Sequence, residues 1–380
     1  MLACEKAYAK INHYLYLTGT RADGYHDLDT VMQTITLHDT IMLDVATVSP
    51  AQAAALVSVA LPLPEGRHNG KAGTESIPLQ ILSQNEVSGY LPWVGLDLSF
   101  VPDPEAAPAP AGQACRPAAP YLSLAAADCR KNLIFKAFSQ YLQRFGCPTG
   151  LSEALWQVRQ AAPGALPLIR LFIIKRIPAR AGLGGGSADA AAVLRMLLNL
   201  ETNAKQPDRN AVLALAGDLG ADVPFCLAGG LRRCTGIGDI MHELPLPSPQ
   251  PCLLLKPQTD SETAVAFARF DHLVSPAERR RINERHVIRT AEAWSDRKGN
   301  DFAFLQSADW PWLQQAQLLL ETLYPGSRTD LTGSGSCMYC LPVDQPVCGP
   351  RRLHSPALPE TIREQTWWLW KGYTYCQTLY

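Results

Sequence analysis

The sequence is most informative at Pro178-Ala-Arg-Ala-Gly-Leu-Gly-Gly-Gly-Ser-Ala-Asp-Ala-Ala-Ala192. Four glycines lie within five residues there, and Ser187 and a run of strong helix formers follow them. A glycine has no Cβ atom, so its backbone can turn sharply and come close to a bound molecule. The free N–H groups and the positive dipole end at the start of a helix favour a phosphate group. We therefore expect a loop that holds a polyphosphate through its backbone and leads into a helix beginning at or beside Ser187.

Two familiar phosphate-binding patterns fit this stretch badly. A P-loop needs a lysine directly before its serine or threonine, and Gly186 stands there instead. A dinucleotide-binding fingerprint follows its strand directly, whereas Lys175-Arg-Ile-Pro-Ala-Arg-Ala181 separates the apolar run at 171–174 from the first glycine. A glycine-rich turn without any ligand stays open as an alternative when the loop is taken alone.

The composition is that of an ordinary globular protein of about two domains. The 380 residues carry a formal net charge of -1 and are 18% charged, which indicates neither nucleic-acid nor membrane binding. Charges interrupt the N-terminal segment where a signal peptide needs apolar residues, and no apolar run is long enough to span a bilayer. The 11 cysteines are scattered, and the lone pair Cys337-Met-Tyr-Cys340 has no second pair or histidine at zinc spacing. We therefore expect a cytoplasmic protein with reduced cysteines and with no nucleic-acid or membrane partner.

Hydrophobic patterning predicts a mixture of strands and helices along the chain. Strands are expected around 11–17, 34–45, 168–174, 252–256, 337–341 and 365–370, and helices at 132–145, after the glycines and at 210–219. A Pro-rich joint at 244–251 suggests a boundary between an N-terminal domain, residues 1–246, and a C-terminal domain, residues 247–380. Between about 47 and 121 the pattern weakens, and we interpret its Pro/Ala-rich end at 101–120 as an extended, mobile loop.

Four further motifs have ordinary interpretations when each is taken alone. Lys10 stands at the head of the first expected strand, where a surface lysine is common. Asp222 follows a glycine and an alanine, a setting typical of a turn or a helix cap. Asp23-Gly-Tyr-His26 is typical of a polar turn, and Thr332-Gly-Ser-Gly-Ser336 of a turn that leads into a strand. Their joint order along the chain is more informative than any one of them.

That joint order resembles the GHMP kinases, a family of small-molecule kinases that includes galactokinase, homoserine kinase and mevalonate kinase. The resemblance is carried by Ala9-Lys-Ile-Asn12, Arg21-Ala-Asp-Gly-Tyr-His26, Lys175-Arg-Ile-Pro178, Gly182-Leu-Gly-Gly-Gly-Ser-Ala-Asp-Ala190, Leu219-Gly-Ala-Asp-Val-Pro-Phe225 and Thr332-Gly-Ser-Gly-Ser336. The glycine loop is common to the family. The motifs that end at His26 and Phe225 are most similar to those of members that act on 4-diphosphocytidyl-2-C-methyl-D-erythritol. The resemblance covers residues 1–45, about 128–240 and most of 250–370.

The resemblance implies a two-domain α+β fold, with a ribosomal protein S5 domain 2-like N-terminal domain, a ferredoxin-like C-terminal domain and the active site in the cleft between them. It implies phosphorylation of the substrate 2-hydroxyl by ATP with Mg²⁺, a step of the non-mevalonate isoprenoid pathway. By the same resemblance, Asp222 is the general base on that hydroxyl, and Lys10 holds the oxygen and the transferring phosphoryl group. Elementary chemistry agrees, because an alcohol attacks phosphorus readily only when a base accepts its proton. We expect a monomer or a weak homodimer.

The resemblance also implies which residues bind ATP and substrate. The ATP phosphates would be held by Pro178, Gly182, Leu183, Gly184, Gly185, Gly186, Ser187 and Ala188, with Ser187 also a candidate ligand of Mg²⁺. Tyr25 would stack on the cytosine of the substrate, and His26 would form hydrogen bonds with it. Asn12 would contact the methylerythritol end or help to place Lys10. Gly333, Ser334 and Gly335 would close over the site from the second glycine loop.

Several points stay open at the level of sequence. Asp189 is a rival for the general base, although its place in the helix after the loop directs its side chain along that helix. His26 could be only a turn residue, and Arg180 could add charge beside the phosphates or be solvated. Another GHMP kinase, or a catalytically silent nucleotide-binding protein, would share most of these motifs. The chain is also longer than is usual in the family, and the excess at 47–121 and 152–166 carries no motif that we can assign.

Overall fold

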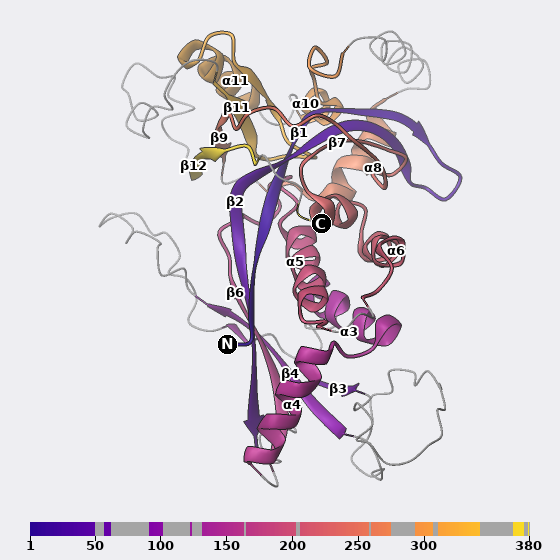
Figure 1. Ribbon diagram of the computed structural model, residues 1–380. Helices are drawn as coiled ribbons and strands as arrows, with labels where there is room; N and C mark the ends of the chain where they lie inside the picture. The colour runs from indigo at the N-terminus through magenta and orange to yellow at the C-terminus, as the bar shows by residue number, and fades with distance from the viewer. Residues whose placement is uncertain are drawn as a thin grey trace. The chain divides into compact units, whose positions relative to one another are not determined.

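The computed structural model describes residues 1–49, 57–61, 91–101, 122–123, 131–162, 165–202, 206–257, 260–274, 293–306, 311–342, 368–375 and 379 (Figure 1). The chain divides into two compact units. Unit 1 comprises residues 1–7, 39–176 and 186–223, and unit 2 comprises residues 8–38, 177–185 and 224–380. The two long N-terminal strands, β1 (Ala3–Thr20) and β2 (His26–Val48), contribute residues to both units. The domain boundary between residues 246 and 247 stays a prediction.

Unit 1 is built on a sheet with the strand order β3-β4-β6-β2. The second half of β2 pairs antiparallel with β6 (Leu166–Ile174), from Thr40 opposite Ile174 to Val48 opposite Leu166. Beyond β6 lies β4 (Leu91–Val101) in parallel, and β4 pairs in turn with β3 (Val57–Leu61) and β5 (Leu122–Ser123). Regular strands therefore occupy part of the segment 47–121, where the sequence pattern indicated none. The Pro/Ala-rich residues 102–120 lie outside the described residues.

The helices of unit 1 are α3 (Leu133–Phe145), α4 (Thr149–Ala161), α5 (Gly185–Asn199, whose first residue belongs to unit 2) and α6 (Arg209–Leu219). Figure 1 shows α3 and α5 on one side of β2 and β6. The predicted start and end of α3 are confirmed: Asn132 accepts a hydrogen bond from the Ile134 N–H at 2.8 Å, and Gly146 ends the helix with a φ of 85°. The excess at 152–166 lies largely in α4.

Unit 2 contains the first half of β2, which pairs with β7 (Leu231–Thr235), and β7 pairs with β8 (Ile240–Glu243). A second, antiparallel sheet has the order β10-β11-β9-β12, formed by Arg328–Leu331, Met338–Leu341, Pro251–Lys256 and Trp368–Tyr373. The other helices are α7 (Val223–Ala228, whose first residue belongs to unit 1), α8 (Thr263–Leu273), α10 (Asp301–Gln306) and α11 (Pro311–Leu323). Leu253, Phe270, Leu320 and Met338 pack together in a core between this sheet and its helices.

The expected α+β class is confirmed, and the strands and helices predicted from periodicity are present, although β1 and β2 each begin eight residues earlier than predicted. One placement was wrong. Lys10 lies in the middle of β1 rather than at the head of a strand, because the strand already begins at Ala3. In the described part of the chain, no helix combines the length and the apolar character needed to cross a bilayer.

A buried histidine lies on β1 in unit 2. The His13 Nε2 atom is 2.7 Å from the Gln33 side-chain oxygen, and no protein atom is paired with the buried Nδ1. Burial, together with the positive charge of Arg328, lowers the pKa of His13 from 6.5 to about 3, against the opposing effect of the Gln33 hydrogen bond. His13 is therefore neutral in the folded protein at pH values where it is protonated in the unfolded chain.

This difference predicts that His13 makes the fold less stable in mild acid. Between the unfolded pKa of 6.5 and the folded value of about 3, the unfolded chain binds more protons, so stability falls as the pH falls. From pH 7.5 to pH 5 the loss due to His13 is about 2 kcal/mol. Denaturant unfolding of the wild type and of His13→Gln at both pH values measures it. Other groups titrate equally in both proteins, so the difference between the two free energies of unfolding isolates His13. If this difference is the same at both pH values, the assignment is wrong.

Candidate active site

Lys10 and Asn12 lie on the same face of β1, since they are two residues apart on a strand. The Lys10 Nζ atom donates a hydrogen bond of 2.8 Å to the Asn12 side-chain oxygen. The two residues are only 3% and 2% exposed, which is rare for a lysine. The surface lysine considered above is therefore excluded, and Asn12 holds the ammonium group in place.

The Asn12 side chain is engaged at both ends of its amide. Its oxygen also accepts a hydrogen bond from the Gly333 N–H at 2.9 Å, and its nitrogen donates to the Thr30 hydroxyl at 2.9 Å. The Thr332 hydroxyl in turn accepts a hydrogen bond from the Asn12 backbone N–H at 3.2 Å. Asn12 therefore connects Lys10 to the second glycine loop, Thr332–Ser336.

The first glycine loop meets the second one within unit 2. The Gly182 backbone has a φ of 73°, and an added Cβ atom would lie 2.0 Å from the Thr332 carbonyl oxygen. The Cys337 N–H donates to the Ala181 carbonyl oxygen at 3.2 Å. The Lys10 N–H donates to the Leu183 carbonyl oxygen at 3.1 Å. The backbone of β1 and the two loops are thus brought together around Lys10.

Residues outside the predicted set hold the second loop in position. The Asn300 amide nitrogen donates to the carbonyl oxygens of Leu331 and Gly333, each at 2.8 Å. The Ser261 hydroxyl donates to the Ser334 carbonyl oxygen at 2.8 Å, and the Thr263 and Ser334 hydroxyl groups are 3.2 Å apart. Sequence reasoning missed Asn300, Ser261 and Thr263, because single polar residues in loops carry no spacing signal.

The expected helix after the glycines is present but begins at Gly185, two residues before Ser187, so Gly186 and Ser187 lie in its first turn. The first N–H groups of an α-helix have no partner within the helix and favour an anion. Ser187 is partly exposed, whereas Ala188, which was also expected to bind ATP, is buried. Pro178 is partly exposed on the approach to the loop. Arg180, left open above, forms an exposed ion pair of 2.8 Å with Glu262.

The two rival carboxylates differ in their surroundings. Asp222 belongs to unit 1, precedes α7 directly and is partly exposed. Asp189 is only 4% exposed, and its carboxylate accepts a hydrogen bond of 2.7 Å from the Lys175 ammonium group. Burial raises the pKa of Asp189 to about 7, although Lys175 opposes this change. Asp189 is therefore held in a buried ion pair, whereas the partly exposed Asp222 stays the predicted base.

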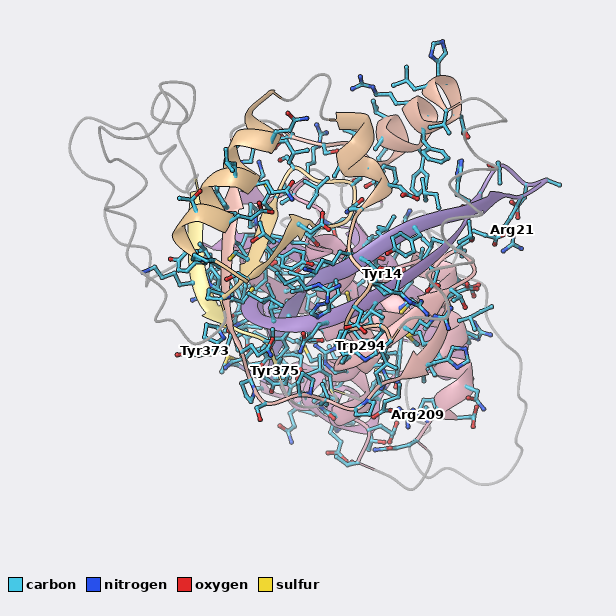
Figure 2. The ribbon with its side chains drawn as sticks, turned by 90° about the horizontal axis from the view of Figure 1, so that it is seen from above. Tyr14, Arg21, Arg209, Trp294, Tyr373 and Tyr375 are labelled. Atoms are coloured by element: carbon cyan, nitrogen blue, oxygen red, sulfur yellow. The ribbon has the colours of Figure 1, made fainter. Side chains whose placement is uncertain are left out.

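The predicted cytosine contacts lie where the turn after β1 enters β2: Tyr25 is the last residue before β2, and His26 is its first residue. Figure 2 shows Arg21 near the outer end of this hairpin. Tyr25 is 59% exposed. The His26 Nε2 atom is 2.9 Å from an Asp271 carboxylate oxygen, and the imidazole stacks on the Phe267 ring, with centroids 4.8 Å apart. Sequence reasoning missed Phe267 and Asp271, although their spacing of four residues places them on one face of α8.

Comparison with known proteins supports the resemblance found in the sequence. Residues 132–230 match the family model for the N-terminal domain of GHMP kinases. A protein of Desulfitobacterium hafniense (strain Y51), 4-diphosphocytidyl-2-C-methyl-D-erythritol kinase, is 31% identical over 266 residues, which cover 70% of this chain and 60% of the relative. The protein of the same name from Persephonella marina (strain DSM 14350 / EX-H1) is 27% identical over 338 residues, with coverages of 87% and 88%. A crystal structure of 4-(cytidine 5'-diphospho)-2C-methyl-D-erythritol kinase has a TM-score of 0.53 and 26% identity, and the match covers 98% of this chain and 99% of that one.

Residues 132–230 form a GHMP kinase N-terminal domain. The expected GHMP kinase fold is thereby confirmed. The match to the D. hafniense relative spans about three-fifths of that protein's length. The GHMP domain model covers the glycine loop and Asp222, whereas Lys10, His26 and the second glycine loop lie outside its range.

Replacement of Gly182 by alanine is expected to disrupt the GHMP glycine loop. The new Cβ atom would collide with the Thr332 carbonyl group in addition to the strain of a positive φ. Gly326 is a matched control, because its φ of 77° carries the same strain and nothing lies within 4 Å of its added Cβ atom. We expect Gly326→Ala to lower the free energy of unfolding by about 1 kcal/mol and Gly182→Ala by about 2 kcal/mol more. Denaturant unfolding measures both, and equal losses would contradict the close contact between the loops.

Proposed function

We propose that this protein phosphorylates the 2-hydroxyl of 4-diphosphocytidyl-2-C-methyl-D-erythritol with ATP. The observation that carries the proposal is the arrangement within unit 2, where a buried lysine held by Asn12 meets two glycine loops. The relatives that bear the name of this kinase support the choice of substrate. A monomer or weak homodimer, and a cytoplasmic location, stay predictions.

In the proposed reaction, the substrate oxygen attacks the γ-phosphorus of ATP and the bond from that phosphorus to the ADP oxygen breaks. Asp222 accepts the hydroxyl proton as the new bond forms, which makes the alcohol a competent nucleophile. The Lys10 ammonium group, held by Asn12 at 2.8 Å, stabilises the negative charge on the transferring phosphoryl group and the attacking oxygen. A fixed cation is effective here because a buried site screens its charge less than water does.

The residues of the glycine loop and of the α5 N-terminus fit the phosphates of ATP. Gly182 and Gly184 have φ values of 73° and 70°, which favour glycine, and the first turn of α5 offers N–H groups to an anion. Among the described residues, no group of three His, Cys, Asp or Glu side chains could hold a metal ion. Mg²⁺ usually binds through one or two protein ligands, water and the substrate phosphates. Ser187 in the first turn of α5 is the proposed protein ligand, and Mg²⁺ would offset phosphate charge there.

The surroundings of His26 support recognition of a cytosine. Phe267 stacks on the imidazole and Asp271 hydrogen-bonds to Nε2, so the ring is fixed in one orientation. The exposed Tyr25 ring beside it offers a flat apolar face, and an aromatic face is suited to stacking with a base. GHMP kinases that act on homoserine or mevalonate have no base to bind, so this cluster favours a cytidyl substrate over theirs.

Release of ADP by the purified protein tests the proposal directly. Mg-ATP is supplied with 4-diphosphocytidyl-methylerythritol and, in parallel, with homoserine, mevalonate and free methylerythritol phosphate. We expect turnover with the cytidyl substrate alone. Turnover only with another acceptor would overturn the substrate and keep the family chemistry. ATP binding without turnover on any acceptor would indicate a catalytically silent protein.

Replacement of Asp222 by asparagine is expected to abolish catalysis without abolishing nucleotide binding. The amide cannot accept the proton, so we expect kcat to fall by about a thousandfold or more, while the Kd for ADP stays within about threefold. Asp218→Asn is the matched control, because Asp218 is an exposed residue of α6 four positions earlier. If Asp222→Asn turns over normally and Asp189→Asn is inactive at saturating ATP, Asp189 is the base.

Replacement of His26 by alanine is expected to weaken substrate binding selectively. Loss of the oriented imidazole should raise the substrate KM by about tenfold, equivalent to about 1.4 kcal/mol, with the KM for ATP nearly unchanged. His272→Ala is the control, since His272 is an exposed histidine on α8. Steady-state kinetics with each substrate varied separately measure the effect, and equal changes in both KM values would count against a cytidine contact.

A further inference from the structure

An ion pair in unit 1 joins the two flanks of the glycine loop. The chain leaves unit 1 after Arg176 and returns to it at Gly186, so residues 177–185 form a loop between these points. Lys175 lies just before the first point and Asp189 just after the second, and their charged groups are 2.7 Å apart. The pair therefore fixes the distance between the two ends of the loop.

A third residue anchors this pair to the sheet. Asp39 on β2 is fully buried, and one of its carboxylate oxygens accepts a hydrogen bond from the Lys175 ammonium group. Its other oxygen accepts a hydrogen bond from the Arg176 backbone N–H, and the Arg176 guanidinium group donates to the Thr40 hydroxyl at 3.0 Å. The point where the chain leaves unit 1 is thus held to β2 through both side chain and backbone.

The cluster combines one ammonium group with two buried carboxylates. The Asp189 Oδ1 atom is buried with no hydrogen-bond partner. The Asp189 and Asp39 carboxylates raise the pKa of Lys175 although its burial opposes this, so the lysine stays charged. A buried ionic cluster of this kind is a poor source of stability, because desolvation offsets much of the attraction. Its geometry is better explained by the position that it imposes on the chain.

Asp189 lies one helical turn after the start of α5. An ion pair at this position fixes the first turn of the helix, whose N–H groups favour a phosphate. We propose that Asp39, Lys175 and Asp189 are positioning residues that hold both flanks of the glycine loop at the spacing needed for a nucleotide phosphate. This inference rests on the proposed nucleotide-binding role of residues 182–187. The three residues act through the loop backbone and need no contact with the nucleotide.

The test compares two variants that each loosen the attachment of α5 within unit 1. Asp189→Ala removes the ion pair at the loop, and Lys175 keeps Asp39 as a partner, so the lysine retains a counter-charge. Glu5→Ala removes a carboxylate that pairs at 3.0 Å with Arg195, which lies further along the same helix and keeps its bond to the Lys6 carbonyl oxygen. The readouts are Tm, the Kd for ADP by calorimetry, and hydrogen exchange of residues 177–187.

We expect both variants to melt at a lower temperature than the wild type. Only Asp189→Ala should also weaken ADP binding, by about tenfold, and speed exchange in residues 177–187. Asp189→Asn, which keeps an oxygen for Lys175, should recover part of the affinity. Wild-type affinity in Asp189→Ala, or an equal loss in Glu5→Ala, would overturn the inference.

The exchange measurement separates this inference from the proposed function. If the wild type binds no ADP, the proposed function fails, yet the structural part of the inference still predicts faster loop exchange in Asp189→Ala than in Glu5→Ala. If the wild type binds ADP and the two variants exchange alike in this loop, the proposed function stands and the positioning role fails.

Discussion

The site in unit 2 depends on the close contact between the backbones of the two glycine loops. A Cβ atom at Gly182 would lie 2.0 Å from the Thr332 carbonyl oxygen. Because the two glycine loops touch through their backbones, the Asn12 amide can hydrogen-bond to the second loop while it holds Lys10. The Lys10 backbone is bonded to the first loop at Leu183. The location of the buried ammonium group therefore follows from backbone packing, and a side chain at Gly182 would disturb all of these contacts together.

Features with a local cause could be predicted from the sequence. The glycine pattern and the helix formers behind it were sufficient to predict the loop and α5. Gly146 and Gly220 end their helices where expected. Contacts between residues that are far apart in the sequence could not be predicted. Asp39 reaches Lys175 from 136 residues away, and His26 meets Asp271 across 245 residues. Neither spacing carries a periodic signal, since only the pairing of strands and the packing of α8 create these contacts.

The strands within 47–121 show a different reason for failure. β4 contains Pro92 and Gly95, which are both unfavourable inside a strand, so its sequence does not indicate a strand. Its parallel pairing with β6, from Gly95 opposite Leu168 to Val101 opposite Ile174, supplies order that local preference does not. The pairing also covers an edge of β6 that would otherwise present unpaired backbone groups. Part of the extra sequence of this chain therefore extends the sheet of unit 1.

A site made of backbone needs support from elsewhere. Glycines allow a close approach to phosphate, yet they have no side chains with which to fix their own positions. The charged and polar residues that fix this loop lie outside its glycine run: Asn12 acts through the second loop in unit 2, and Lys175 and Asp189 act at the flanks in unit 1. Burying such groups is costly, and the cost falls on the stability of the fold. The glycine run and the buried charged residues near it are thus two consequences of one requirement, a flexible backbone segment held in a single conformation.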